Sequence, residues 1–342
     1  MTAAVTLDAW AGDVPPAVVA ALASAQQVLV VSHENPDADT LGAALGIGRI
    51  LDARGVRTTL VCTDVPPPLY GFLPGIERFR TDPDESTAYD RLVIVDCGAL
   101  DRVGAVRDRH PDLFAALPTV VIDHHASNGA AGPSDWVDPA AAATCEMVAL
   151  VSGALGVPLD RDGGALATAL MAGIVMDTAT FAHPNATPRT LAVSAALVGA
   201  GAPLSEISRL LYRSKPDVQL RLFGRVLDRL EASADGLVVH STLTLADIAE
   251  TGALSSHSEG IIDLLSQSEA AEVAILFKEA GPAVTRVSVR TKPGGVDATA
   301  LTGAFGGGGH ARAAGASVAA AVVEARGAVL READRLARAV RR

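Results

Sequence analysis

Residues 28–53 have the sequence VLVVSHENPDADTLGAALGIGRILDA, and this stretch decides the fold class. Val28–Ser32 is an apolar run that predicts a buried strand, and Leu41–Ala53 has the apolar spacing of a helix. The polar loop between them contains His33, Asp37 and Asp39, which form a His-x-x-x-Asp-x-Asp pattern. A strand that ends in polar residues and leads into a helix is typical of an α/β protein with a parallel sheet.

Further apolar runs in the first half end in the same way. Leu92–Val95 stops at Asp96, and Val120–Ile122 stops at Asp123. Thr58–Cys62 is another candidate strand, and helix-like segments rich in Ala and Leu lie between the runs. Because continuous apolar strands suit a sheet that is buried on both sides, we predict an α/β fold whose first domain has a parallel sheet with helices on both faces.

The pattern changes after residue 202, which predicts a second domain. We assign residues 1–202 to the first domain, 203–222 to a linker and 223–342 to a smaller α/β domain. Strand-like runs in the second domain lie at Leu237–Leu243, Val273–Phe277 and Val284–Arg290. A basic helix follows, which we interpret as a solvated face; its arginines are Arg331, Arg335, Arg338, Arg341 and Arg342.

Composition limits the classes of function. The chain has 342 residues, of which 49% are apolar, so it can bury sizeable cores. Its net charge is −11, whereas a protein that binds long duplexes is normally basic, because neutralising phosphates supplies most of the non-specific affinity. An acidic chain that handles phosphates needs local positive charge from metal ions or a few Arg and His residues. We therefore expect a small or short substrate and no stable complex with long nucleic acid.

Cysteine usage and the start of the chain indicate a reducing compartment. Cys62, Cys97 and Cys145 form no C-x-x-C pair, and an odd, sparse count fits the cytosol better than a disulfide framework. Met1–Pro16 lacks a basic segment and carries two aspartates, unlike a signal peptide. No apolar run approaches the ~20 residues that span a bilayer. We predict a cytoplasmic protein with buried cysteines and no membrane partner.

The strand-end residues have the chemistry of a metal site. Loop 33–39, Asp96 and Asp123-His124-His125 follow three strands of one predicted sheet, and Asp177 ends the predicted helix Gly163–Asp177. Oxygen ligands with some imidazole suit Mn²⁺ or Mg²⁺, and the sequence has no cysteine set for structural zinc. Each residue alone fits a helix cap or a polar loop. Their convergence on one edge favours a two-metal site that activates water and neutralises a phosphoryl transition state.

The order of these residues resembles the DHH phosphoesterases. The family pattern stands in this chain at residues 33–39, 96, 123–125 and 177. Residues 305–315, FGGGGHARAAG, resemble the DHHA1 substrate-binding domain that accompanies one branch, so the combined match covers nearly the whole chain. Within the family, the chain looks most like the bifunctional oligoribonucleases that are also 3′-phosphoadenosine 5′-phosphate phosphatases. Some relatives also cleave cyclic di-AMP and its linear product.

The resemblance implies a role for each residue. One metal would be held by His33, Asp37 and Asp96, and the second by Asp39, Asp96, His124 and Asp177, with Asp96 bridging. Asp123 would orient the site and His125 would contact the scissile phosphate, so both are assigned to catalysis. Ala38 replaces a Gly that many relatives have, which should leave the ligands in place. The family's usual ion is Mn²⁺, with Mg²⁺ or Co²⁺ as alternatives. Relatives are often homodimers, and we expect the same here.

The second domain is expected to select the substrate. Glycine-rich turns let backbone N–H groups approach a phosphate closely, which singles out Gly307, Gly308 and Gly309. His310 and Arg312 could hold a terminal phosphate or stack on a base, and Arg290 at a strand end is a further candidate. His183 and Arg189 are weaker candidates for substrate contact.

We therefore predict a metal-dependent phosphoesterase, with the substrate entering between the two domains. It would hydrolyse short oligoribonucleotides or linear dinucleotides to nucleoside 5′-monophosphates and remove the 3′-phosphate of 3′-phosphoadenosine 5′-phosphate, with cyclic di-AMP as a further candidate.

Three alternatives stay open at this point. An inorganic pyrophosphatase would need a second domain rich in basic residues. A single-strand exonuclease would need an added nucleic-acid-binding module, and a non-catalytic nucleotide sensor would be expected to have lost ligand residues. The sequence does not rank the substrates, and it does not determine the cleavage polarity or the native metal.

Overall fold

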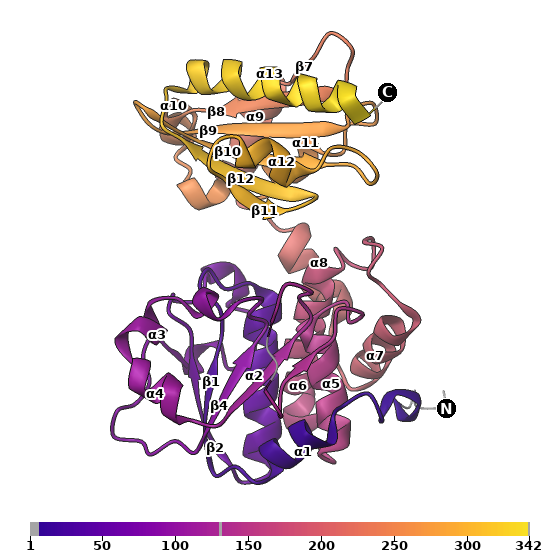
Figure 1. Cartoon of the computed structure of the whole chain (residues 1–342). Helices are drawn as coiled ribbons and strands as arrows, with labels where there is room; N and C mark the ends of the chain where they lie inside the picture. The colour runs from indigo at the N-terminus through magenta and orange to yellow at the C-terminus, as the bar shows by residue number, and fades with distance from the viewer. Residues whose placement is uncertain (1–6, 130–131, 341–342) are drawn as a thin grey trace. The chain divides into compact units, whose positions relative to one another are not determined.

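The computed structural model describes residues 7–129 and 132–340 and divides into two compact units (Figure 1). Unit 1 is Met1–Ser214 and unit 2 is Lys215–Arg342. Part of the prediction about the N-terminus, at residues 1–6, and two arginines of the predicted basic helix, Arg341 and Arg342, lie outside the described residues. The interval assigned to a linker, residues 203–222, contains a helix of unit 1 and the start of a helix of unit 2.

A parallel sheet forms the centre of unit 1. Its strand order is β3–β2–β1–β4–β5–β6, and each neighbouring pair is parallel. The strands are β1 (Gln27–Val31), β2 (Arg57–Val61), β3 (Phe79–Arg80), β4 (Arg91–Val95), β5 (Thr119–Asp123) and β6 (Trp136–Val137). The three strands that were predicted to end at ligand residues, β1, β4 and β5, are adjacent, so their carboxyl ends meet at one edge.

Helices connect these strands and continue after β6. The α-helices are α1 (Pro16–Ala23), α2 (Ala38–Ala53), α3 (Ala105–Arg109), α4 (Pro111–Ala116), α5 (Thr144–Ala154), α6 (Arg161–Asp177), α7 (Pro188–Gly199) and α8 (Leu204–Tyr212). Short 3₁₀ turns are η1 (Asp8–Trp10), η2 (Pro68–Tyr70), η3 (Ile76–Arg78) and η4 (Leu100–Val103). Within the described residues, no single helix is long and apolar enough to cross a membrane; α7 and α8 meet that test only together, as a pair bent by 111°.

Apolar side chains cover both faces of the unit 1 sheet. One face packs against α2, α5 and α6 through Val28, Val30, Val93, Val95 and Ile122. The other face packs under η4, α3 and α4 through Leu29, Val31, Leu92, Ile94 and Val121. Successive strand residues point to opposite faces, so a sheet covered on both sides requires continuous apolar strands. The predicted fold class is confirmed.

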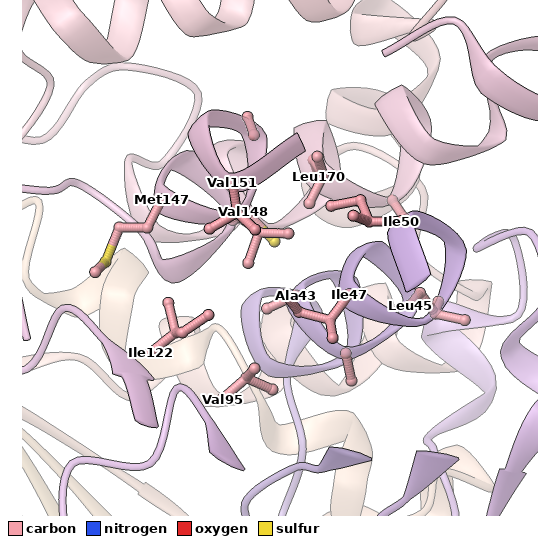
Figure 2. Close-up of a cluster of buried hydrophobic side chains, with 14 of the residues drawn as sticks. Ala43, Leu45, Ile47, Ile50, Val95, Ile122, Met147, Val148, Val151 and Leu170 are labelled. Carbon is pink, nitrogen blue, oxygen red and sulfur yellow. The ribbon is translucent and has the colours of Figure 1, made fainter. Parts of the chain in front are cut away.

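Helix α2 lies in the middle of the larger core. Figure 2 shows Ala43 and Ile47 of α2 near Val95 and Ile122 of the sheet, with side chains of α5 and α6 on the far side of the helix. All four of these residues are buried. Because α2 begins at the loop that carries the predicted ligands, its packing determines where that loop lies.

Unit 2 has a mixed sheet of order β11–β12–β10–β9–β8–β7, in which only β8 and β9 run parallel among the described pairs. Its strands are β7 (Glu231–Ala232), β8 (Val238–Leu243), β9 (Val273–Gly281), β10 (Val284–Thr291), β11 (Gly308–His310) and β12 (Ala313–Val318). Its helices are α9 (Asp217–Asp228), α10 (Leu245–Thr251), η5 (Ser255–Ser258), α11 (Ile261–Leu265), α12 (Ala298–Gly303) and α13 (Val322–Val340). One face packs against α12 and α13, and the other against α9, α10 and α11.

Close packing of α2 against α6 requires a glycine, and it can be tested. A Cβ on Gly42 would collide with the carbonyl oxygen of Ala169 and lie 2.9 Å from the sulfur of Cys145. We expect Gly42→Ala to lower the free energy of unfolding by about 1–3 kcal/mol, as overpacking of a filled core does. Urea unfolding followed by circular dichroism measures this change.

The matched control is Gly153→Ala on α5, where an added Cβ meets nothing within 4 Å. A helical Gly→Ala change at an open position should be neutral or stabilise by up to about 1 kcal/mol. Equal stability of the two variants would contradict the close approach of α2 and α6.

Candidate metal centre

The carboxyl ends of β1, β4 and β5 bring the predicted ligand residues together, and we call this the carboxyl edge. His33 follows β1 after one residue, Asp96 follows β4 directly, and Asp123 is the last residue of β5. Parallel pairing in register brings the three strands to an end at nearly the same level. Ligands of open α/β sheets bind at such an edge.

His33, Asp37 and Asp96 form a first group. The Nε2 atom of His33 lies 3.5 Å from a carboxylate oxygen of Asp96 and 3.8 Å from one of Asp37. The Nδ1 atom of His33 lies 2.7 Å from the carbonyl oxygen of Glu34, which assigns the proton to Nδ1 and leaves the lone pair on Nε2. Burial lowers the pKa of His33, which favours the neutral ring. The ligand atoms of this group lie within 4.8 Å of one another, close enough to share one cation.

Asp39, His124 and Asp177 form a second group of the same kind. The Nε2 atom of His124 lies 3.1 Å from a carboxylate oxygen of Asp177 and 3.5 Å from one of Asp96. The Nδ1 atom of His124 faces the carbonyl oxygen of Ala141 at 3.4 Å, so Nε2 again points toward the carboxylates. The second group therefore repeats the chemistry of the first, with oxygen and imidazole donors.

Backbone N–H groups hold the aspartates of the β1–α2 loop. Both carboxylate oxygens of Asp39 accept hydrogen bonds, from the amides of Thr144 at 2.7 Å and Cys145 at 2.9 Å. Asp37 is the N-cap of α2 and accepts from the amides of Asp39 and Thr40 at 2.9 and 3.1 Å. The loop predicted for residues 33–39 is therefore shorter than expected: Asp39 lies in the first turn of α2, because Asp37 caps the helix there.

Asp96 joins the two groups. Its carboxylate lies 3.5 Å from His33 on one side and 3.5 Å from His124 on the other. Its backbone has φ +56°, a left-handed conformation that costs free energy for a residue other than glycine. The amide of Asp96 donates to the carbonyl of Ile122 at 3.0 Å, and the hydroxyl of Thr144 donates to its carboxylate at 3.1 Å. These bonds hold a strained turn that directs one carboxylate toward both groups.

Burial and like charges make the carboxyl edge unfavourable without cations. Burial, followed by Asp39 and Asp37, raises the pKa of Asp96 well above its usual range. Burial and then Asp39 raise the pKa of Asp177 to about 7. Burial opposes protonation of His124, but Asp177 and Asp39 raise its pKa to about 9. A bound divalent cation would stabilise the carboxylates and displace the imidazole proton, so the donor set fits hard or borderline metal ions.

Asp123 has a different role from its neighbours. Its carboxylate accepts from Nδ1 of His125 at 2.8 Å, from the amide of His125 at 3.1 Å and from the side-chain amide of Asn128 at 2.6 Å. Burial raises the pKa of Asp123, but hydrogen bonds from His125 and Asn128 outweigh this effect and bring the pKa below its ordinary value. Asn128 also donates to the carbonyl of Cys97 at 3.0 Å. This arrangement fixes the orientation of the His125 ring.

Several residues near the edge were not singled out from the sequence. Thr144 and Asn128 bond the aspartates directly, and Asn185 donates to the carbonyl oxygens of Asp177 and Ala142 at 3.2 and 3.1 Å. Only the position of Asn128, five residues after Asp123 at the end of a strand, offered a local signal. The contacts of Thr144 with Asp96 and of Asn185 with Ala142 join segments that are more than 40 positions apart in the chain.

The two weaker candidates for substrate contact have structural partners. The guanidinium of Arg189 binds Glu146, Asp138 and Asp13, and its side chain is only 12% exposed. The Nδ1 atom of His183 lies 3.1 Å from the carbonyl oxygen of Asp177. Arg189 is therefore committed to carboxylates of the protein itself.

The predicted substrate residues of unit 2 lie on neighbouring strands. Gly308, Gly309 and His310 form β11, which pairs with β12, so this glycine run is in part a strand rather than a turn. His310 pairs with Ala313, which pairs in turn with Arg290 of β10. Arg290 donates to Asp263 at 3.0 Å.

Two glycines of this hairpin are required by its geometry. A Cβ on Gly307 would collide with the carbonyl of Gly315, and Gly309 has φ +139°. Arg312 is exposed in the turn between β11 and β12, and its carbonyl accepts from the amide of Thr291 at 3.1 Å. The hairpin therefore presents His310 and Arg312 beside a backbone with few side chains.

Comparison with known proteins agrees with both parts of the pattern. Residues 27–174 match the model described as the DHH family, N-terminal domain, and residues 238–339 match the DHHA1 domain. A relative from Thermus thermophilus is 32% identical over 296 residues, which is 85% of this chain and 84% of the relative. The chain belongs to the DHH family. The resemblance inferred from the sequence is confirmed.

The names of the relatives are consistent with one another. The Thermus thermophilus protein is named bifunctional oligoribonuclease and PAP phosphatase NrnA, as is a Bacillus subtilis protein that is 26% identical over 85% of this DHH chain and 89% of its own length. A solved structure from Bacteroides fragilis, called an exopolyphosphatase-related protein, has a TM-score of 0.86 over 96% of this chain and 98% of its own, at 21% identity. That likeness concerns the fold alone.

The shared position of Asp96 predicts how this DHH chain binds metal. Asp96→Asn removes the charge but keeps the size, and Asn also tolerates the left-handed backbone. We expect calorimetric titration with Mn²⁺ to detect two ions per wild-type chain. Both affinities should fall in the variant by more than about 100-fold. Replacing a residue that only orients a ligand typically costs up to about 100-fold, and loss of a shared ligand should cost more.

Asp108→Asn, at an exposed position on α3, is the matched control and should leave both affinities unchanged. If Asp96→Asn bound Mn²⁺ as tightly as the wild type, Asp96 would not be a ligand shared by two ions.

Proposed function

We propose that this DHH chain is a two-metal phosphoesterase that hydrolyses short oligoribonucleotides to nucleoside 5′-monophosphates and removes the 3′-phosphate of 3′-phosphoadenosine 5′-phosphate. The observation that carries the proposal is the pair of ligand groups at the carboxyl edge that share Asp96. Membership of the DHH family and the names of two relatives support the choice of phosphate esters.

Two divalent cations bound at the carboxyl edge, with Mn²⁺ proposed first, would polarise the phosphate and lower the pKa of a water molecule that attacks phosphorus. His33, Asp37 and Asp96 would hold one ion, and Asp39, His124 and Asp177 would share Asp96 to hold the other. We propose that Asp123 and Asn128 hold the nearby ring of His125 in a fixed orientation beside these ligands.

His125 is the proposed contact to the scissile phosphate. Asp123 accepts a hydrogen bond from Nδ1–H of His125, which fixes the plane of the ring. When Nε2 carries a proton, it would donate a hydrogen bond to a phosphate oxygen or the proton to the leaving oxygen. We assign Asp123 a positioning role, because its carboxylate accepts hydrogen bonds from the ring and amide of His125 and from Asn128.

A short substrate suits the charge of the chain. With a net charge of −11, the protein repels a long polyanion, and attraction has to come from bound cations and local arginines. We assign selection of the substrate to the β11–β12 hairpin of unit 2, where Gly307–Gly309 have no side chain to keep a phosphate from the backbone and lie beside His310 and Arg312. Such a site fits a terminal phosphate or base better than an extended strand.

A panel of phosphate compounds tests the proposal. Purified protein with Mn²⁺, Mg²⁺ or Co²⁺ would be offered RNA of a few nucleotides, long single-stranded RNA, linear and cyclic di-AMP, 3′-phosphoadenosine 5′-phosphate and pyrophosphate. We expect mononucleotides from short RNA and linear di-AMP, and AMP plus phosphate from the bisphosphate, detected by chromatography. Asp96→Asn should be slower by about 10³-fold or more, since metal stabilisation of several kcal/mol is lost, and Asp108→Asn should match the wild type.

The panel also separates the alternatives. Pyrophosphate as the only substrate would indicate an inorganic pyrophosphatase, and a preference for long RNA would indicate an exonuclease. Tight nucleotide binding without turnover of any compound would indicate a sensor. Each of these results would contradict the proposed substrate class.

Substitution of Arg312 tests the role of unit 2. Arg312→Met removes an exposed cation without disturbing a buried contact. We expect KM for short RNA to rise about tenfold with little change in kcat, because a charge-assisted hydrogen bond to phosphate contributes about 1.5–3 kcal/mol to binding. Arg331→Met on α13, an equally exposed arginine, is the control and should leave KM unchanged. An unchanged KM in Arg312→Met would exclude Arg312 from the substrate site.

A further inference from the structure

A partly buried ion-pair network is centred on Arg189. The guanidinium of Arg189, at the start of α7, binds Glu146 at 2.5 Å, Asp138 at 2.7 Å and Asp13 at 2.8 Å. The side chain of Glu146 is fully buried, and that of Arg189 is 12% exposed. Removing one partner from such a network leaves a buried charge uncompensated, so each member constrains the others strongly.

Glu146 and Asp138 hold residues 138–146, which are the turn after β6 and the first three residues of α5 and which we call the clamp turn. The second oxygen of Glu146 accepts from the amide of Ala142 at 3.2 Å and from the hydroxyl of Thr190 at 2.7 Å. The carboxylate of Asp138 accepts from the amide of Ala140 at 3.0 Å, and the amide of Asp138 donates to the carbonyl of Asp123. Arg189 therefore bonds a carboxylate at each end of the clamp turn.

The clamp turn contacts two members of the second ligand group, Asp39 and His124, and is linked to the backbone of the third, Asp177, through Asn185. Its amides at Thr144 and Cys145 bond both oxygens of Asp39. Its carbonyl at Ala141 faces Nδ1 of His124. The side-chain nitrogen of Asn185 donates both to the carbonyl of Ala142 in the clamp turn and to the carbonyl of Asp177. The chain of bonds thus runs from Arg189 to Asp39, His124 and Asp177.

The first ligand group is held by other parts of the chain. His33 is oriented by the carbonyl of Glu34, and Asp37 by the amides of Asp39 and Thr40 at the start of α2. Among the described residues, the contact between the clamp turn and this group is the hydroxyl of Thr144 on Asp96, the ligand common to both groups. The ligands of the two candidate ion sites are therefore oriented by largely separate sets of hydrogen bonds.

We propose that Arg189 is a positioning residue that sets the affinity of only one of the two metal sites, the one formed by Asp39, His124 and Asp177. The inference rests on the two-metal site of the proposed function. Partners that orient metal ligands from outside typically contribute 10–100-fold to affinity, so a selective loss of about that size is expected when Arg189 is replaced.

Calorimetric titration with Mn²⁺ and Mn²⁺ electron paramagnetic resonance test the proposal without substrate. In Arg189→Met we expect one of two ions to bind at least about tenfold more weakly while the other keeps its affinity. At limiting Mn²⁺, the broadened spectrum of a coupled pair should give way to the resolved hyperfine pattern of an isolated ion. With short RNA, kcat should fall at Mn²⁺ concentrations that saturate the wild type and recover at higher Mn²⁺, with KM for RNA unchanged.

Two further variants separate positioning from simple loss of stability. Arg49→Met removes another mostly buried arginine of unit 1, paired with Asp162 at 3.0 Å, and should leave both ions bound normally. The double variant Arg189→Met with Glu146→Gln removes the uncompensated buried charge and should regain thermal stability but still bind one ion weakly. Arg189→Lys, which keeps the charge but not the three-way geometry, should show an intermediate loss.

The outcomes are distinguishable. Equal weakening of both ions, or of neither, in the folded Arg189 variants would overturn the positioning role while leaving the phosphoesterase proposal intact. A wild-type chain that binds no Mn²⁺ would overturn both. Loss of one ion in Arg189→Met and in the double variant, but not in Arg49→Met, is the result that supports the inference.

Discussion

Repulsion between buried carboxylates at the carboxyl edge is the constraint on which the rest of unit 1 depends. Burial raises the pKa of Asp96 most, and the charges of Asp39, Asp37, Asp177 and Asp123 raise it further. Two like charges 4 Å apart oppose each other by about 4 kcal/mol at an effective dielectric constant of 20. A whole domain is stable by only about 5–15 kcal/mol, so such a cluster persists only where the surrounding structure offsets the repulsion.

The protein offsets this repulsion differently for each aspartate. Asp37 caps α2. Asp39 accepts hydrogen bonds from the amides of Thr144 and Cys145. Asp123 accepts hydrogen bonds from His125 and Asn128. Asp96 and Asp177 keep raised pKa values in spite of their partners. These two carboxylates therefore depend most on a cation. Asp96 belongs to the first ligand group and Asp177 to the second, so both groups contain a carboxylate of this kind.

The sequence predicted which side chains come together at the carboxyl edge, because topology alone brings strand ends together. Once β1, β4 and β5 are parallel neighbours, residues such as His33 and Asp96 must lie at one edge, whatever the details of packing. The start of α2 was missed by a few residues, since the N-cap role of Asp37 was not recognised. The supports of Asp39 and the network of Arg189 could not be predicted, because they join residues more than 40 positions apart through tertiary packing.

Asp177 is an acidic residue at a position where local preference disfavours a carboxylate. It is the last residue of α6, where the helix dipole favours a cation and opposes a carboxylate. Its own carbonyl is satisfied from outside the helix, by the side chains of His183 and Asn185. What remains unfavourable is the half-buried side chain, whose pKa of about 7 reflects loss of solvent first and Asp39 next. A carboxylate at a helix C-terminus is stabilised by a positive charge opposite it; His124 lies 3.1 Å away, and a bound cation would add to its effect. The position of Asp177 is thus an argument for a cation at the carboxyl edge that is independent of the pattern of strand ends.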